Sequence, residues 1–116
     1  MKTSYRAIPE KMFLQQVIDL AHLTGWLCYH THDSRRSCPG FPDLALCHPG
    51  RHLYLLAELK SERGRLSPAQ QSWIDALREA SIEVHVWRPA DFDVIVTRLT
   101  IGVDNQRVIM STKLHI

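Results

Sequence analysis

Two carboxylates and one ammonium occupy the ends of neighbouring apolar segments. Residues 53–59 are apolar on both faces of an expected strand, and Glu58 and Lys60 at its end share one face because they are two residues apart. Asp43 opens the preceding apolar segment, so antiparallel pairing brings it near Glu58. Carboxylate oxygens at such spacing can hold one hard divalent cation such as Mg²⁺. The alternative is a strand end that emerges into solvent, where charges are well hydrated.

The turn between these two segments sets which residues face each other. If residues 49–50, a Pro-Gly pair, form the centre of a two-residue turn, Asp43 lies opposite Leu56, on the face that carries Glu58. The two carboxylates are then diagonal neighbours, with backbones roughly 7–8 Å apart. A slip of one residue would move Asp43 to the other face, so the prediction of a shared site depends on this register.

The elements that position these residues follow from apolar periodicity and turn chemistry. Ser67 can cap a helix, and Gln70 can close a capping box with it. The element order is α-β-β-β-α-β-α, which predicts an α/β architecture (an α+β mixed sheet with flanking helices). Helices are expected over residues 8–24, 67–80 and 90–99, and strands over residues 26–30, 43–47, 52–59 and 82–87. A loop spans 31–42, another spans 60–66, and residues 100–116 receive no assignment.

Composition limits the class of protein. A chain of 116 residues, 45% hydrophobic and 22% charged, predicts a single globular domain over residues 1–116. The longest apolar run falls short of the roughly 18 residues that a membrane span needs, and the first residues lack a signal-peptide core. Three cysteines, an odd number, fit a reducing compartment, so we expect a cytoplasmic protein.

The net charge of +2 is small, but its distribution is uneven. Residues 34–65 carry six basic and three acidic side chains, whereas the rest of the chain is close to balanced. A local basic surplus indicates a surface that faces phosphate groups, and the alternative is an ordinary solvated surface.

A family resemblance rests on these same residues. Residues 40–43 (Gly-Phe-Pro-Asp), followed after fourteen residues by Glu58-Leu59-Lys60, resemble the signature of PD-(D/E)xK nucleases. The flanking segments 32–37, 64–73 and 83–89 resemble the stand-alone VRR-NUC (virus-type replication-repair nuclease) domain of bacteria and phages. The resemblance covers about residues 8–99 and implies a restriction-endonuclease-like core.

The resemblance also implies roles for individual side chains. Asp43 and Glu58 would bind the metal, with the Leu59 carbonyl as a further ligand. Glu10 matches an acidic position that helps complete the metal site, although a carboxylate there also suits a helix N-terminus by itself.

Two more residues complete the catalytic set that the resemblance implies. Lys60 would position or activate the attacking water and offset charge on the transition-state phosphate. Gln70 matches a polar residue that faces the active site, and capping its own helix is the simpler alternative. The candidate contacts to DNA are Ser34, Arg35, Arg36, Lys60 and Arg65, of which the first three are otherwise ordinary loop residues.

The resulting expectation is a metal-dependent DNA endonuclease that hydrolyses phosphodiester bonds. The resemblance implies Mg²⁺ as cofactor, with Mn²⁺ able to substitute, a homodimer, and branched DNA such as Holliday junctions as substrate in DNA repair. Residues 101–116 are a candidate for the dimer interface.

Three alternatives stay open. One is a zinc site built from cysteines and histidines, although their spacing is not typical of zinc ligands. Another is a non-catalytic nucleic-acid-binding module, and the last is a restriction or repair nuclease that acts on linear or flapped DNA. The ligands available to zinc are Cys28, Cys38, Cys47, His30, His32, His48 and His52.

Overall fold

The structure is a computed structural model that describes residues 8–31 and 38–104. Its order of helices and strands is the one that the sequence predicts, with two short 3-10 turns added. The helices are α1 (Glu10–Leu23), α2 (Pro68–Glu79) and α3 (Phe92–Asp104). The strands are β1 (Leu27–His30), β2 (Leu44–His48), β3 (Leu53–Leu59) and β4 (Val84–Trp87), and the 3-10 turns are η3 (Pro49–Arg51) and η4 (Pro89–Asp91).

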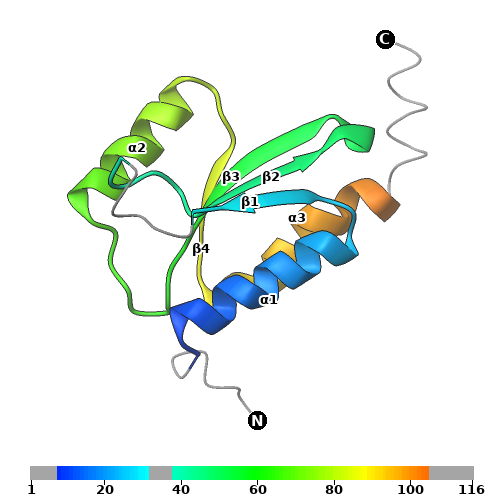
Figure 1. The fold of residues 1–116 in the computed structure, drawn as a ribbon, viewed down its shortest axis with the longest axis horizontal. Helices are drawn as coiled ribbons and strands as arrows, with labels where there is room; N and C mark the ends of the chain where they lie inside the picture. The colour runs from blue at the N-terminus through cyan, green and yellow to red at the C-terminus, as the bar shows by residue number, and fades with distance from the viewer. Residues whose placement is uncertain (1–7, 32–37, 105–116) are drawn as a thin grey trace.

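The strands form one mixed sheet in the order β1-β2-β3-β4 (Figure 1). The first three strands are antiparallel, and β4 pairs with β3 in parallel. A parallel pair needs a crossover connection, and α2 supplies it. The prediction of a mixed sheet with flanking helices is therefore confirmed.

The two faces of the sheet are covered differently. Helices α1 and α3 lie on one face, and α2 lies on the other, over β3 and β4 (Figure 1). The first face forms the larger core, in which Phe13 and Val17 of α1 pack against Leu46 and Leu55 of the sheet. The second core is smaller and centres on Leu56, Ile74 and Val84.

Local chemistry explains where the helices start and stop. Helix α1 follows Pro9, carries Glu10 in its first turn, and ends before Gly25, whose φ of +93° suits glycine. The capping box predicted for α2 is present: Gln70 N–H donates to Ser67 Oγ, and Ser67 N–H donates to Gln70 Oε1. Helix α3 starts later than expected because η4 precedes it.

The predicted register between β2 and β3 is wrong by two residues. Leu56 lies opposite Ala45, and Leu44 pairs with Ala57, so Asp43 precedes the ladder next to Glu58. The cause is the connection: η3 and one left-handed residue make a four-residue link, because Pro-Gly does not suit the primed turns of two-residue hairpins. An even shift keeps every side chain on its predicted face.

The C-terminal part differs from the expectation in extent. Helix α3 continues to Asp104, five residues beyond the predicted end. The proposed role of residues 101–116 in a dimer interface concerns side chains outside the described part of the chain. Within the described ranges, no helix combines the length and apolarity that crossing a membrane requires.

Candidate active site

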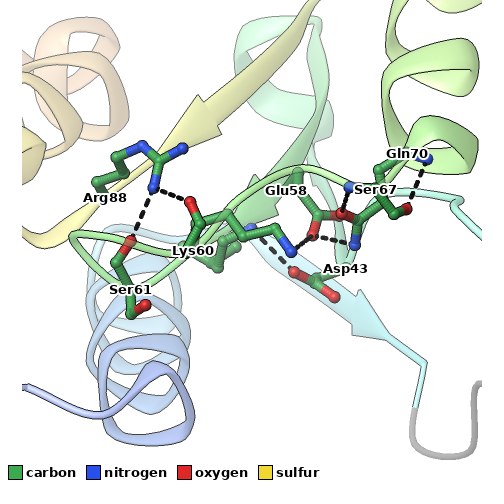
Figure 2. A network of polar contacts seen from close by, with 9 residues as sticks. Asp43, Glu58, Lys60, Ser61, Ser67, Gln70 and Arg88 are labelled. Carbon is green, nitrogen blue, oxygen red and sulfur yellow. Dashed lines mark hydrogen bonds and ion pairs between the residues drawn. The ribbon is translucent and has the colours of Figure 1, made fainter.

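The predicted site forms where β3 ends, β2 begins and α2 starts (Figure 2). Asp43 stands immediately before β2, and its Oδ2 accepts a hydrogen bond of 2.9 Å from the Leu59 backbone N–H. This bond continues the β2–β3 ladder through a side chain. The Asp43 carboxylate is thereby fixed beside the end of β3, where Glu58 and Lys60 leave the same face.

Glu58 is the most buried charged residue of the site, with 1% of its surface exposed. Its Oε2 accepts a hydrogen bond of 2.9 Å from Gln70 Nε2 and lies 3.8 Å from Lys60 Nζ. Its Oε1 is buried and has no hydrogen-bond partner among the described residues. Buried polar atoms are normally satisfied, so this oxygen points to a ligand that the protein itself does not supply.

Both carboxylates have unusual electrostatics. Burial, followed by the negative charge of Asp43, raises the pKa of Glu58 to about 8, while the Lys60 ammonium opposes the shift. Burial also raises the pKa of Asp43, although the hydrogen bond from Leu59 N–H works in the other direction. Two neighbouring buried carboxyl groups resist simultaneous ionisation unless a cation joins them. The protein therefore places two acids where a positive ion would be strongly favoured.

Gln70 both caps α2 and faces the candidate site, the two roles that the sequence left open. Its Oε1 accepts from Ser67 N–H at 2.8 Å, and its Nε2 donates to Glu58. The neighbouring Gln71 instead donates to Asp75 on the exposed side of α2. The start of α2 is thus tied directly to the buried carboxylate, and the polar residue that faces the site is Gln70.

Leu59 offers its backbone to the site. Its N–H points toward Asp43, and the N–H and C=O of one strand residue leave the chain on the same side. The next residue, Lys60, donates its N–H to Trp87 O of β4, so the backbone is held on both sides at this point. The Leu59 carbonyl is consequently a suitable additional oxygen ligand.

Glu10 lies at the first position of α1 and is exposed. Its negative charge contributes to the raised pKa of Glu58, so it acts on the site electrostatically. In residues 8–31 and 38–104, His, Cys, Asp and Glu side chains form no group of three that could hold a metal ion. The structure thus brings Asp43 and Glu58 together as a pair and leaves Glu10 outside their immediate group.

The same observation bears on the zinc alternative. Cys28, Cys38, Cys47, His30, His48 and His52 do not converge in the described part of the chain, and His32 lies outside it. The proposed DNA contacts Ser34, Arg35 and Arg36 also lie outside the described residues. Arg65 is exposed on the loop between β3 and α2, on the way from Lys60 to Gln70.

Gly40 is a structural requirement of the site that sequence reasoning missed. It has a φ of +96°, and a Cβ atom placed on it would lie 2.5 Å from the backbone of Ala69 in α2. Next to it, Phe41 packs edge-to-face on Trp73 with ring centroids 5.0 Å apart. The segment before Asp43 is thereby pressed against the first turn of α2. A glycine three residues before the acidic residue was the available signal.

His30 is a further residue near the pair. It ends β1, pairs with Leu44, and its positive charge would lower the pKa of Asp43. It is close enough to influence the Asp43 carboxylate without belonging to a metal-binding group of the described residues.

These features define a class: a mixed α+β domain with a paired-carboxylate site and a lysine at the end of its central strands. The chain belongs to the VRR-NUC domain family, whose sequence model matches residues 7–91. The match contains the complete site described above.

Two related proteins carry nuclease names. The Fanconi-associated nuclease 1 homolog of Schizosaccharomyces pombe is 39% identical over 56 residues, a stretch equal to 48% of this chain and 8% of that protein. Fanconi-associated nuclease 1 of Danio rerio is 36% identical over 64 residues, covering 55% of this chain and 6% of that protein. The chain thus spans only a small part of these relatives, and the family and relatives together support a nuclease.

A solved structure described as a VRR_NUC domain has the same fold. It superposes with a TM-score of 0.60 at 20% identity and covers 82% of this chain and 94% of its own. The architecture in Figure 1 is therefore that of a VRR-NUC domain.

Proposed function

We propose that this domain is a metal-dependent DNA endonuclease that hydrolyses phosphodiester bonds at the Asp43–Glu58–Lys60 site. The observation that carries the proposal is the buried carboxylate pair, in which Glu58 has an unsatisfied oxygen and a pKa raised to about 8. This arrangement is costly for stability, because two neighbouring carboxyl groups are withdrawn from water and the Lys60 ammonium is the one cation paired with Glu58 among the described residues. Chemistry at the site gives a reason for its presence.

Mg²⁺ is the cofactor that fits these donors. Asp43, Glu58 and the Leu59 carbonyl offer only oxygen atoms, which hard divalent cations prefer, and Mg²⁺ commonly keeps several waters beside one or two carboxylates. Mn²⁺ accepts similar ligands and would substitute. When bound, such an ion lowers the pKa of water and polarises a phosphate oxygen.

Lys60, Gln70 and Glu10 have separate roles in the proposed reaction. Lys60 Nζ, 3.8 Å from Glu58, places a positive charge beside the reacting phosphate and is positioned to orient the attacking water. The bond from water oxygen to phosphorus forms as the bond to the leaving oxygen breaks, without a covalent enzyme intermediate. Gln70 holds Glu58 in its orientation through the 2.9 Å hydrogen bond. Glu10 adds negative charge at the edge of the site and favours cation binding.

The substrate we propose is branched DNA, such as a four-way junction, cut by a homodimer. The family membership and the names of the two relatives support a nuclease, and the resemblance to stand-alone VRR-NUC domains suggests the branched substrate and the homodimer. Two-fold symmetry would match paired cuts across a junction. A non-catalytic binding module is the contrasting outcome of the experiments below.

The decisive experiment compares cleavage of junction, flap, nicked and linear DNA with Mg²⁺, Mn²⁺ or a chelator. Asp43→Asn keeps the size of the side chain and removes its charge, so cleavage should fall by about 10³-fold. Asp75→Asn is the matched control, because Asp75 is an exposed carboxylate of α2 bonded only to Gln71 in the described structure. Equal activity of the two variants, or no cleavage with any metal, would reject the proposed function.

The proposed DNA contacts require a separate binding measurement. Arg35→Ala combined with Arg36→Ala should weaken DNA binding and reduce the slope of log Kd against log salt by about two. An unchanged salt slope would show that these arginines do not contact phosphates.

A further inference from the structure

The loop that follows the central strand connects both ends of the candidate site. Residues 60–66, here named the Lys60 loop, begin with Lys60 and lead to Ser67 and Gln70 at the start of α2. Lys60 contacts Glu58 from one side, and Gln70 contacts it from the other. The path of this short loop consequently sets the spacing of the two side chains that control the buried carboxylate.

A single arginine, directly after the neighbouring strand β4, holds this loop. Arg88 comes directly after β4, and its guanidinium reaches Ser61 of the loop (Figure 2). The carbonyl of Trp87, the last residue of β4, accepts the Lys60 N–H. Arg88 Nη1 donates to Ser61 O at 2.8 Å and to Gly64 O at 2.6 Å, with a longer contact of 3.4 Å to Glu62 O. All three acceptors are backbone carbonyls of the Lys60 loop.

The contact is reinforced from the opposite direction. Glu62 Oε1 accepts a hydrogen bond of 3.0 Å from Ala90 N–H, so the loop also binds η4, the turn that directly follows Arg88. Asp91 Oδ2 accepts from Arg88 N–H at 2.9 Å and fixes the backbone of the arginine itself. Within the loop, Gly64 N–H donates to Ser61 O, and a Cβ atom on Gly64 would lie 2.9 Å from Ser61 Oγ.

We propose that Arg88 is a positioning residue of the active site, which acts through the Lys60 loop without contacting the substrate. This inference rests on the proposed nuclease function. The three acceptors of Arg88 Nη1 are backbone carbonyls, so these hydrogen bonds do not use the side chains of the loop. Because catalytic groups must be placed to within a fraction of an ångström, loosening this loop reduces the rate of the chemical step more than it reduces DNA binding.

A second arginine provides a matched control. Arg98 of α3 is also partly buried and also contacts the β4 region, through paired hydrogen bonds of 2.7 Å to the Glu83 carboxylate. It ties α3 to the start of β4, away from the Lys60 loop. Arg98→Met and Arg88→Met each remove an arginine that stabilises the fold, but only Arg88→Met releases the loop.

The experiment measures kcat and KM for DNA cleavage with Mg²⁺, well below the melting temperature of each variant. Arg88→Met should lower kcat by about tenfold or more and leave KM within about twofold. Arg98→Met should change neither by more than about twofold. Arg88→Lys should recover part of the lost kcat, because one nitrogen makes all three contacts and an ammonium carries three donors. A kcat for Arg88→Met equal to that of Arg98→Met would overturn the proposal.

Amide hydrogen exchange gives a readout that does not depend on cleavage. Backbone amides of residues 61–66 should exchange faster in Arg88→Met and at the wild-type rate in Arg98→Met. Unchanged exchange in Arg88→Met would overturn the inference even if the enzyme is active. If the wild-type protein cleaves no DNA, the proposed function fails, while the exchange result still decides whether Arg88 holds the loop.

Discussion

The two faces of the sheet serve different purposes. The face under α1 and α3 is closed: Phe13, Leu46 and Leu55 have no exposed surface. The face under α2 is covered only over β4 and the later part of β3, and it leaves Leu27 65% and Tyr29 67% exposed on β1 and Tyr54 51% exposed at the start of β3. The carboxylates of the site lie on this second face, at the margin of its core.

The difference between the two faces explains how a small domain tolerates a site that costs stability. The closed face provides the larger core, and its packing is independent of the charged residues. The partly open face can therefore hold Glu58 next to Asp43 at the expense of local stability, while leaving room for a substrate to approach. Stability and chemistry are divided between the faces, and the following predictions test that division.

The largest expected effect is on activity. Lys60→Ala removes the ammonium beside Glu58 and should lower kcat by about 10³-fold, because a positive charge near the reacting phosphate is lost. Far-ultraviolet circular dichroism should be unchanged, since Lys60 belongs to neither core. Lys11→Ala, an exposed lysine on α1, serves as the control for loss of one positive charge. Equal rates for both variants would remove Lys60 from the mechanism.

The closed face should show the opposite behaviour. Phe13→Ala empties a fully buried position and should cost about 3–5 kcal/mol of unfolding free energy, measured by urea denaturation. Its neighbour Met12 is 56% exposed, so Met12→Ala should cost less than about 0.5 kcal/mol. Where Phe13→Ala remains folded, its kcat should match the wild type. A selective loss of kcat in the folded variant would contradict the division between the faces.

The site face should impose a pH dependence on stability. Because the pKa of Glu58 is about 8 in the folded protein and ordinarily 4.5, the folded state keeps a proton that the unfolded state releases between these values. Without metal, the contribution of Glu58 to the free energy of unfolding should therefore be greatest below about pH 4.5. It should decline as the pH rises to about 8.

Glu58→Gln tests this dependence. The variant should be more stable than the wild type at pH 8 in a chelator, by about 1–3 kcal/mol, and should lose most of the decline between pH 5 and 8. Urea denaturation at both pH values provides the measurement, and added Mg²⁺ should stabilise only the wild type. A parallel decline in both proteins would assign the pH dependence to other groups.

The smallest effect is expected on the open part of the second face. Tyr54→Ser should change the unfolding free energy by no more than about 0.5 kcal/mol, because half of the side chain is already in solvent. A cost above about 1 kcal/mol that grows with protein concentration would instead show that a second copy covers this face.

Several parts of this arrangement were predictable because they depend on local patterns. The alternation of side chains along a strand predicted that Asp43, Glu58 and Lys60 share one face. This prediction stayed correct despite the error in register, because a shift of two residues leaves each side chain on the same face. The capping box of α2 follows from Ser67 and Gln70 alone. Periodicity and turn residues likewise located every strand to within two residues of its observed ends.

Other parts depend on contacts between distant segments, which no local pattern encodes. The four-residue connection after β2 requires His52 in a left-handed conformation. The Pro49-Gly50 pair disfavours a two-residue turn, but no local pattern gives the length of the connection that replaces it. Arg88 looks like the end of a strand until its three carbonyl partners, 24 to 27 residues away, are known. The dual role of Gln70 likewise becomes visible only when α2 meets β3.

The close approach of Gly40 to Ala69 has a consequence for the geometry of the site. The segment that ends at Asp43 packs against the first turn of α2 with no space for even a methyl group between Gly40 and Ala69. The position of the Asp43 carboxylate relative to the Gln70 amide therefore depends on this contact between Gly40 and Ala69. A side chain at position 40 would push the segment before Asp43 away from the first turn of α2, and would thereby separate Asp43 from the hydrogen bond that Gln70 donates to Glu58.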